Sequence, residues 1–156
     1  MKKFLFVCTG NTCRSPMAEQ FFLRLAKEAG LDWTAASAGT QAAYGMPLSR
    51  GAAAVFLKKG IGPVKYRAQR VDAALMRDAD RVYVMESMHR DYLKRQHPEH
   101  AAKISMLRED AGLTPGEVED PVGADALEYE ACAASIEEAL KIIVSRENKT
   151  HAQNPR

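Results

Sequence analysis

The chain has 156 residues, of which 46% are hydrophobic and 27% are charged, the proportions of a globular domain. Its formal net charge of +2 is too small to predict binding to nucleic acid or to a membrane surface. No apolar run approaches the ~18 residues that a membrane-spanning helix needs. We therefore expect a single domain over residues 1–146, a frayed polar C-terminal tail over 147–156, and neither nucleic acid nor membrane as a partner.

The first thirty residues predict a strand, a polar loop and a helix. Residues 3–7 form an apolar run of strand length. Ser15 is a preferred N-cap residue, and Pro16 behind it suits the first position of a helix. Apolar residues then recur at helical spacing until Gly30, which is expected to end the helix. Strand, loop and helix in this order open a βαβ unit.

Strands and helices continue to alternate along the chain. We expect further strands at 33–38, 81–85 and 103–107, helices at 49–59, 71–77, 88–95 and 126–145, and a Gly- and Pro-rich loop at 108–125. The alternation predicts an α/β fold, with a four-stranded parallel sheet flanked by helices on both faces. Ligands of such sheets bind beyond the carboxyl ends of the strands, so we expect the loops at 8–15 and 108–125 to face one another.

The chain has three cysteines, Cys8, Cys13 and Cys132. The number is odd, too small for a disulfide scaffold, and lacks the four-cysteine spacing of a metal site. We therefore expect a reducing, cytoplasmic compartment and no bound metal. Cys132 falls on the apolar face of the last predicted helix, where core packing is the expected role. The four histidines, His89 among them, are expected to be solvated near helix ends.

The loop between the first strand and the first helix reads Cys-Thr-Gly-Asn-Thr-Cys-Arg-Ser over residues 8–15. A loop that curls into a helix N-terminus can direct successive backbone N–H groups at one centre and bind an anion there. Gly10 and Asn11 tolerate the left-handed conformation that such a turn needs. Arg14 can place two hydrogen bonds on a phosphate. We predict a phosphate-binding loop in which Cys8, stabilised as a thiolate, is the nucleophile.

Residues 8–19 resemble the signature loop of the low-molecular-weight protein tyrosine phosphatase family, and Asp120-Pro121 resembles its general-acid motif. Length and element order agree over nearly the whole chain. The resemblance implies phosphorylated proteins as substrates, a phosphocysteine intermediate and no metal or organic cofactor. Cys8, Arg14 and Asp120 would be the catalytic residues. The residues expected to bind phosphate are Thr9, Gly10, Asn11, Thr12, Cys13, Arg14 and Ser15.

The resemblance also implies roles for two neighbours of the nucleophile. Ser15 matches a residue whose hydroxyl hydrogen-bonds the cysteine sulfur, a role compatible with capping the helix. Cys13 matches a redox partner that protects the nucleophile through a reversible Cys8–Cys13 disulfide. Core packing is the alternative for Cys13. The oligomeric state is left open.

Three positions bear on which phosphorylated side chain is the substrate. Phosphotyrosine-cleaving members usually have an aliphatic residue at the position of Thr12 and aromatic residues soon after the Asp-Pro pair, which enclose a phenol ring. Thr12 resembles the protein-arginine-phosphatase branch instead, whose substrate guanidinium needs polar partners. Val122 departs from the aromatic residue expected in both branches, and Tyr44 could supply an aromatic rim. We favour phosphoarginine, with phosphotyrosine as the alternative.

Two other function classes are remote alternatives. A thiol-linked arsenate reductase shares this loop, but it needs additional cysteines in the middle of the chain, and none occurs between Cys13 and Cys132. A non-catalytic anion-binding module would not need the combination of Cys8, Arg14 and Asp120.

Overall fold

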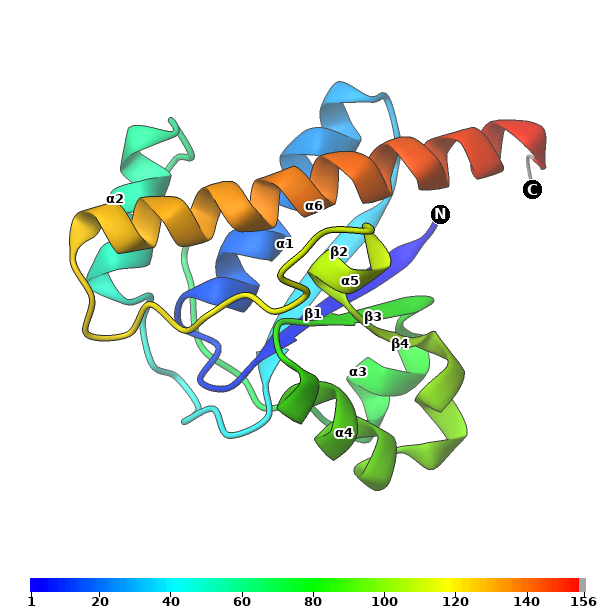
Figure 1. Cartoon of the computed structure of the whole chain (residues 1–156), viewed down its shortest axis with the longest axis horizontal. Helices are drawn as coiled ribbons and strands as arrows, with labels where there is room; N and C mark the ends of the chain where they lie inside the picture. Colours follow the sequence, from blue (N-terminus) through cyan, green and yellow to red (C-terminus); the bar gives the residue numbers. More distant parts are fainter. Residues whose placement is uncertain (155–156) are drawn as a thin grey trace.

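The computed structural model describes residues 1–154, which fold around a four-stranded parallel sheet (Figure 1). The strands lie in the order β2-β1-β3-β4, and all three neighbouring pairs are parallel. Their bounds are β1 (Lys3–Cys8), β2 (Thr34–Gly39), β3 (Arg81–Val84) and β4 (Ile104–Met106). The carboxyl end of β1, at Cys8, therefore lies between the segments that follow β2 and β3.

Helices cover both faces of the sheet, as the sequence predicts. One face carries α1 (Arg14–Glu28), α2 (Arg50–Lys58), α5 (Leu107–Asp110) and α6 (Ala126–Gln153), and the other carries α3 (Ala73–Asp78), α4 (Ser87–Gln96) and the 3-10 helix η1 (Pro98–Lys103). None of these helices is long and apolar enough to cross a membrane.

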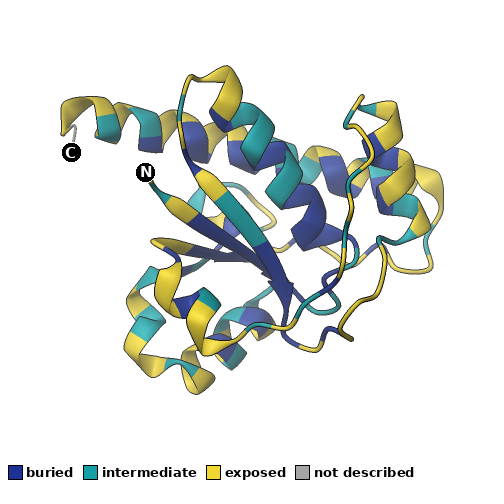
Figure 2. Ribbon diagram, turned by 180° about the vertical axis from the view of Figure 1, so that it is seen from behind, coloured by how far each residue is buried: buried dark blue, intermediate teal, exposed yellow. Residues whose placement is uncertain are grey.

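Side chains of β1 alternate between the two helical layers, because successive residues of a strand point to opposite faces. Phe4, Phe6 and Cys8 belong to the core beneath α1 and α6, whereas Leu5 and Val7 pack with α3 and α4. Figure 2 shows the resulting buried centre of the sheet. Cys8 therefore projects toward the side of the sheet on which α1 begins.

The loop predicted over residues 108–125 begins with a short helix instead. Leu107 is fully buried at the start of α5, and the Arg108 side chain donates hydrogen bonds to the carbonyl groups of Pro115, at 2.8 Å, and Ser135, at 2.9 Å. These long-range contacts fix a helical turn that local composition does not indicate. They also hold the segment after α5 against α6.

The last helix is longer than the sequence predicts. The pattern indicates an end near residue 145 and a frayed tail from 147, but α6 continues to Gln153. Glu147 is only 6% exposed and accepts a hydrogen bond from Lys2 Nζ at 2.6 Å, and the His151 ring lies edge-on to Trp33. The expectation of a frayed tail is wrong for residues 147–153, because tertiary contacts order these turns. Residues 155 and 156 of that tail lie outside the described residues.

Removing residues 147–156 should lower the stability of the domain by about 1–3 kcal/mol, because it removes the buried partner of Lys2 and the neighbour of Trp33. Urea unfolding measures the loss, and the fluorescence of Trp33, the single tryptophan of the chain, reports the local change. Lys149→Ala, an exposed substitution on the same helix, is the control and should leave both readouts unchanged. Equal stability of the truncated and complete chains would contradict the anchoring role of these turns.

Candidate active site

In the loop between β1 and α1, the backbone donors of residues 9–13 are free within the described chain and most of the carbonyl groups accept hydrogen bonds. Within residues 1–154, no backbone N–H of residues 9–13 donates to a protein acceptor. The carbonyl groups of Cys8, Thr9 and Thr12 each accept a hydrogen bond at 2.9 Å from a residue of the segment after β2: Thr40, Gln41 and Ser49 respectively. Because the carbonyl groups are tied to this outer segment, the N–H groups are left to bind an anion.

Gly39, at the end of β2, allows that segment to lie against the loop. A Cβ atom at this position would lie 2.4 Å from the Thr9 carbonyl oxygen and 3.0 Å from the Asn11 nitrogen. Both obstacles are backbone atoms, which cannot move aside as a flexible side chain can. The close approach therefore requires glycine.

Asn11 supplies the left-handed residue of the loop, with φ of 55°, whereas Gly10 is not in that region. The sequence predicts that either residue could take this role. Asn11 is fully buried, its Oδ1 accepts from the Gln69 N–H at 2.9 Å, and its carbonyl accepts from the Tyr66 hydroxyl at 2.5 Å. Its Nδ2 donates to Ser15 and to Ser37, at 2.8 and 3.1 Å. The buried hydrogen bonds of Asn11 thus hold the conformation that glycine would adopt without them.

The Cys8 sulfur lies next to the Ser15 hydroxyl, with Sγ 3.0 Å from Oγ. The predicted N-cap role of Ser15 is wrong, because α1 begins at Arg14 and Cys13 occupies the cap position without a capping hydrogen bond. The Ser15 hydroxyl is instead buried between the sulfur and Asn11. It is therefore placed to stabilise a thiolate rather than a helix N–H.

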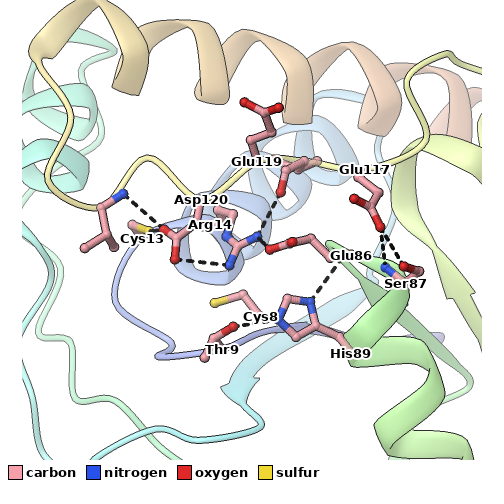
Figure 3. A network of polar contacts seen from close by, with 12 residues as sticks. Cys8, Thr9, Cys13, Arg14, Glu86, Ser87, His89, Glu117, Glu119 and Asp120 are labelled. Carbon is pink, nitrogen blue, oxygen red and sulfur yellow. Dashed lines mark hydrogen bonds and ion pairs between the residues drawn. The ribbon is translucent and has the colours of Figure 1, made fainter.

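Arg14 brings together three segments that are distant in the sequence (Figure 3). Its guanidinium is 1% exposed; Nη1 pairs with the Glu86 carboxylate and donates to the Val118 carbonyl at 2.8 Å, and Nη2 lies 3.5 Å from Asp120 Oδ2. Burial opposes the charge, but the hydrogen bond to Glu86 and nearby Asp120 outweigh it and raise the pKa of Arg14. The Nε atom is buried without a hydrogen-bond partner among the described residues.

Asp120 is the carboxylate of the late loop that reaches the site. Its Oδ1 accepts from the Val122 N–H at 3.1 Å and lies 3.9 Å from Cys13 Sγ. Glu117 instead binds Ser87, and the Glu119 side chain points toward α6 (Figure 3). The predicted meeting of the two loops is therefore present.

Cys13 and Cys132 are buried, and both carry free thiols, as does Cys8. Burial raises the pKa of Cys13 to about 12, with the charges of Cys8 and Asp120 adding to the shift, and burial raises that of Cys132 to about 12. Both are therefore neutral thiols near pH 7. The Cys8–Cys13 disulfide stays a prediction. No group of three or more His, Cys, Asp or Glu side chains in residues 1–154 is arranged to hold a metal ion.

The three predicted specificity residues lie at the rim of the loop or on segments beside it. Thr12 is half-buried, and its hydroxyl forms no hydrogen bond with the described part of the chain. Val122, two residues after Asp120, is 65% exposed. Tyr44 is 69% exposed, on the segment that hydrogen-bonds the loop carbonyl groups. Their roles stay predictions.

Sequence reasoning missed Glu86 and His89, which follow the carboxyl end of β3. The expectation that His89 is solvated is wrong: the side chain is 1% exposed, and its Nε2 lies 2.7 Å from Thr9 Oγ1. Burial, followed by the charge of Arg14, lowers the pKa of His89 to about 4. Their place directly after the strand expected at 81–85, at the carboxyl edge of a parallel sheet, is the signal that could have identified them.

Solved structures of two related proteins share this fold over nearly their whole length. A crystal structure of a low molecular weight protein tyrosine phosphatase from T. tengcongensis has a TM-score of 0.89 and 39% identity, covering 94% of this chain and 99% of that one. A mutant of the YwlE arginine phosphatase with a phosphorylated active-site serine has a TM-score of 0.90 and 31% identity, covering 94% and 96%.

Sequence comparison gives the same result. A protein-arginine-phosphatase of Bacillus subtilis (strain 168) is 32% identical over 145 residues, which are 93% of this chain and 96% of that protein. The family model described as low molecular weight phosphotyrosine protein phosphatase matches residues 3–153. The chain belongs to the low molecular weight phosphotyrosine protein phosphatase family.

Proposed function

We propose that this protein is a cysteine-dependent phosphatase of phosphorylated proteins, with phosphoarginine as its preferred substrate and phosphotyrosine as the alternative. The observation that carries the proposal is the arrangement of free N–H groups at residues 9–13 beside Cys8, with Arg14 and Asp120 at the same opening. In this arrangement a phosphoryl group has a nucleophile, a set of anion donors and a proton donor within one site.

Arg14 and the loop amides bind the phosphoryl oxygens. Nη1 of Arg14 is held by Glu86 and Val118, Nε has no partner among the described residues, and Nη2 has only the 3.5 Å contact with Asp120. A phosphate that displaces this looser contact can accept two parallel hydrogen bonds from the edge formed by Nε and Nη2. That edge matches the spacing of two phosphate oxygens. Preorganised donors of this kind stabilise charge as it redistributes in phosphoryl transfer.

The reaction takes place in two displacements. The Cys8 thiolate attacks phosphorus as the bond to the leaving nitrogen or oxygen breaks, and Asp120 gives its proton to the leaving atom. Water then attacks the phosphocysteine, Asp120 accepts a proton from the water, and Cys8 leaves as a thiolate with release of inorganic phosphate. The phosphorylated serine in the structure of one relative supports a covalent route of this kind.

Thr12 favours phosphoarginine over phosphotyrosine. Its unpartnered hydroxyl offers a hydrogen-bond acceptor to a guanidinium, and an aliphatic residue there would offer only apolar surface. The exposed Val122 does not supply the aromatic wall that a phenol ring would pack against. The match to a protein-arginine-phosphatase over most of the chain supports the same choice.

Substitution of the proposed nucleophile and acid tests the mechanism. Cys8→Ser should abolish phosphate release, and Asp120→Asn should lower kcat by about 10²–10⁴, the usual contribution of general acid catalysis. The loss in Asp120→Asn should be smaller on aryl phosphates with good leaving groups, which need less protonation. Glu119→Gln is the matched control, because that carboxylate points away from the site. Absence of turnover by the wild type on all of these substrates would favour an anion-binding module.

A substrate panel tests the choice of phosphorylated side chain. The wild type should have the higher kcat/KM on phosphoarginine peptides, and Thr12→Ile should lower that value about tenfold relative to phosphotyrosine, the equivalent of one hydrogen bond to a charged group. Kinetics on paired peptides of identical flanking sequence measure the ratio. A wild type that strongly prefers phosphotyrosine would overturn the assignment of Thr12.

A further inference from the structure

His89 connects the start of α4 to Thr9, the residue that follows the nucleophile. Its Nε2 lies 2.7 Å from Thr9 Oγ1 (Figure 3), and the Thr9 carbonyl accepts from the Gln41 N–H at 2.9 Å on the other side. Gln41 follows β2 and His89 follows β3, the two neighbours of β1. Thr9 is therefore held by hydrogen bonds from the two segments that follow the neighbouring strands, β2 and β3.

The hydrogen bonds around His89 determine where its ring proton lies. The backbone N–H of Glu86 donates to Nδ1 at 3.1 Å. A backbone amide can only donate, so Nδ1 carries the lone pair, and the proton of the neutral ring is on Nε2. Nε2 therefore donates to Thr9, and the Thr9 hydroxyl keeps its own hydrogen for another acceptor.

The same ring also fixes the residue that pairs with Arg14. Glu86 and His89 bond reciprocally, because the Glu86 backbone carbonyl accepts from the His89 N–H at 3.1 Å while Nδ1 accepts from the Glu86 N–H. The Glu86 carboxylate also binds Arg14 Nη1. The buried His89 and the half-buried Glu86 thus contact both the start of the phosphate loop and the guanidinium at its end.

Burial, and after it the charge of Arg14, keeps the His89 ring neutral against the carboxylates that face it. Arg14 faces it from α1, Glu86 from the end of β3, and Glu117 and Asp120 from the loop before α6. Burial and Arg14 together outweigh the three carboxylates, which is why the pKa is lowered to about 4. A protonated ring would have no acceptor for the Glu86 N–H and would place a second cation beside Arg14.

We propose that His89 is a positioning residue of the phosphatase site: its neutral ring orients Thr9 and, through Glu86, Arg14, so that the loop amides and the guanidinium bind the same phosphoryl group. Among the described residues, the ring forms hydrogen bonds with Thr9 and Glu86 and none with the Cys8 sulfur. The expected effect of His89 on turnover rests on the proposed function. The contacts of His89 with Thr9 and Glu86 are independent of it.

Two substitutions of His89 test the roles of the two ring nitrogens separately. His89→Gln can supply a donor near the position of Nε2, and His89→Asn can supply only an acceptor near the position of Nδ1. We expect His89→Asn to lower kcat about tenfold to a hundredfold through misplacement of the loop, with a smaller change in KM, and His89→Gln to retain most of the activity. Thermal unfolding of both variants checks that they fold. Equal losses in the two variants would overturn the role of the donor.

A double-mutant cycle tests whether His89 acts through Thr9. Thr9→Val removes the acceptor of the hydrogen bond, so His89→Asn should cost much less activity in that background than in the wild type. His100→Asn, in η1 and remote from the site, is the matched histidine control and should leave activity unchanged. Fully additive losses at Thr9 and His89 would contradict the proposed connection.

Two readouts do not depend on turnover. Nitrogen-15 NMR of the phosphate-free protein at pH 6 should show His89 neutral with its proton on Nε2; a proton on Nδ1, or on both nitrogens, overturns the inference. Inorganic phosphate should protect Cys8 from alkylation by iodoacetamide, and His89→Asn should raise the phosphate concentration for half-protection about tenfold, the equivalent of one lost charged hydrogen bond. Unchanged protection in this variant would also overturn it. A wild type without phosphatase activity would refute the proposed function while leaving both readouts decisive for His89.

Discussion

The site depends on a set of backbone donors that the fold leaves without acceptors. The N–H groups of residues 9–13 find no acceptor elsewhere in the described chain, and the buried Arg14 beside them leaves its Nε unsatisfied. Buried donors without partners cost free energy, so a fold that retains them must gain that energy elsewhere. Asn11 and the segment after β2 form hydrogen bonds to the outer side of the loop, which stabilise it in this conformation. Under the proposed function, the left-handed residue and the unsatisfied donors serve the same purpose, the binding of an anion.

The three charged groups of the site come from three different segments of the chain. Arg14 lies at the start of α1, Glu86 at the end of β3 and Asp120 on the loop before α6, and only the parallel topology brings these ends together. The guanidinium is shared between two carboxylates in the phosphate-free structure. Under the proposed function, phosphate enters a site whose cation is already oriented, so that the binding energy of the phosphate is not spent on ordering Arg14.

The parts of the site that are local in the sequence could be predicted, and those created by tertiary contacts could not. The spacing of Cys8 and Arg14 between an apolar run and a helix is a local pattern, and it predicts the place of the loop between β1 and α1. Local sequence predicts that Ser15 caps the helix, but its hydroxyl instead forms buried contacts with the Cys8 sulfur and the Asn11 side-chain amide. His89 looks like any histidine near a helix end, since its partner Thr9 is 80 residues away and is reached through the register of β3. The sequence likewise does not show that Glu147 is ordered, because its partner Lys2 is at the opposite end of the chain.

The two edges of the Arg14 guanidinium have different partners, and this difference has a consequence for the proposed reaction. Nη1 holds the Val118 carbonyl, and with it the segment that carries Asp120, while at the opposite edge of the same group Nε has no partner among the described residues and Nη2 has only the 3.5 Å contact with Asp120. Under the proposed function, anion binding at that edge leaves the bond from Nη1 to the Asp120 segment in place. In the proposed reaction, anion exchange and retention of the Asp120 segment are therefore assigned to opposite edges of one side chain.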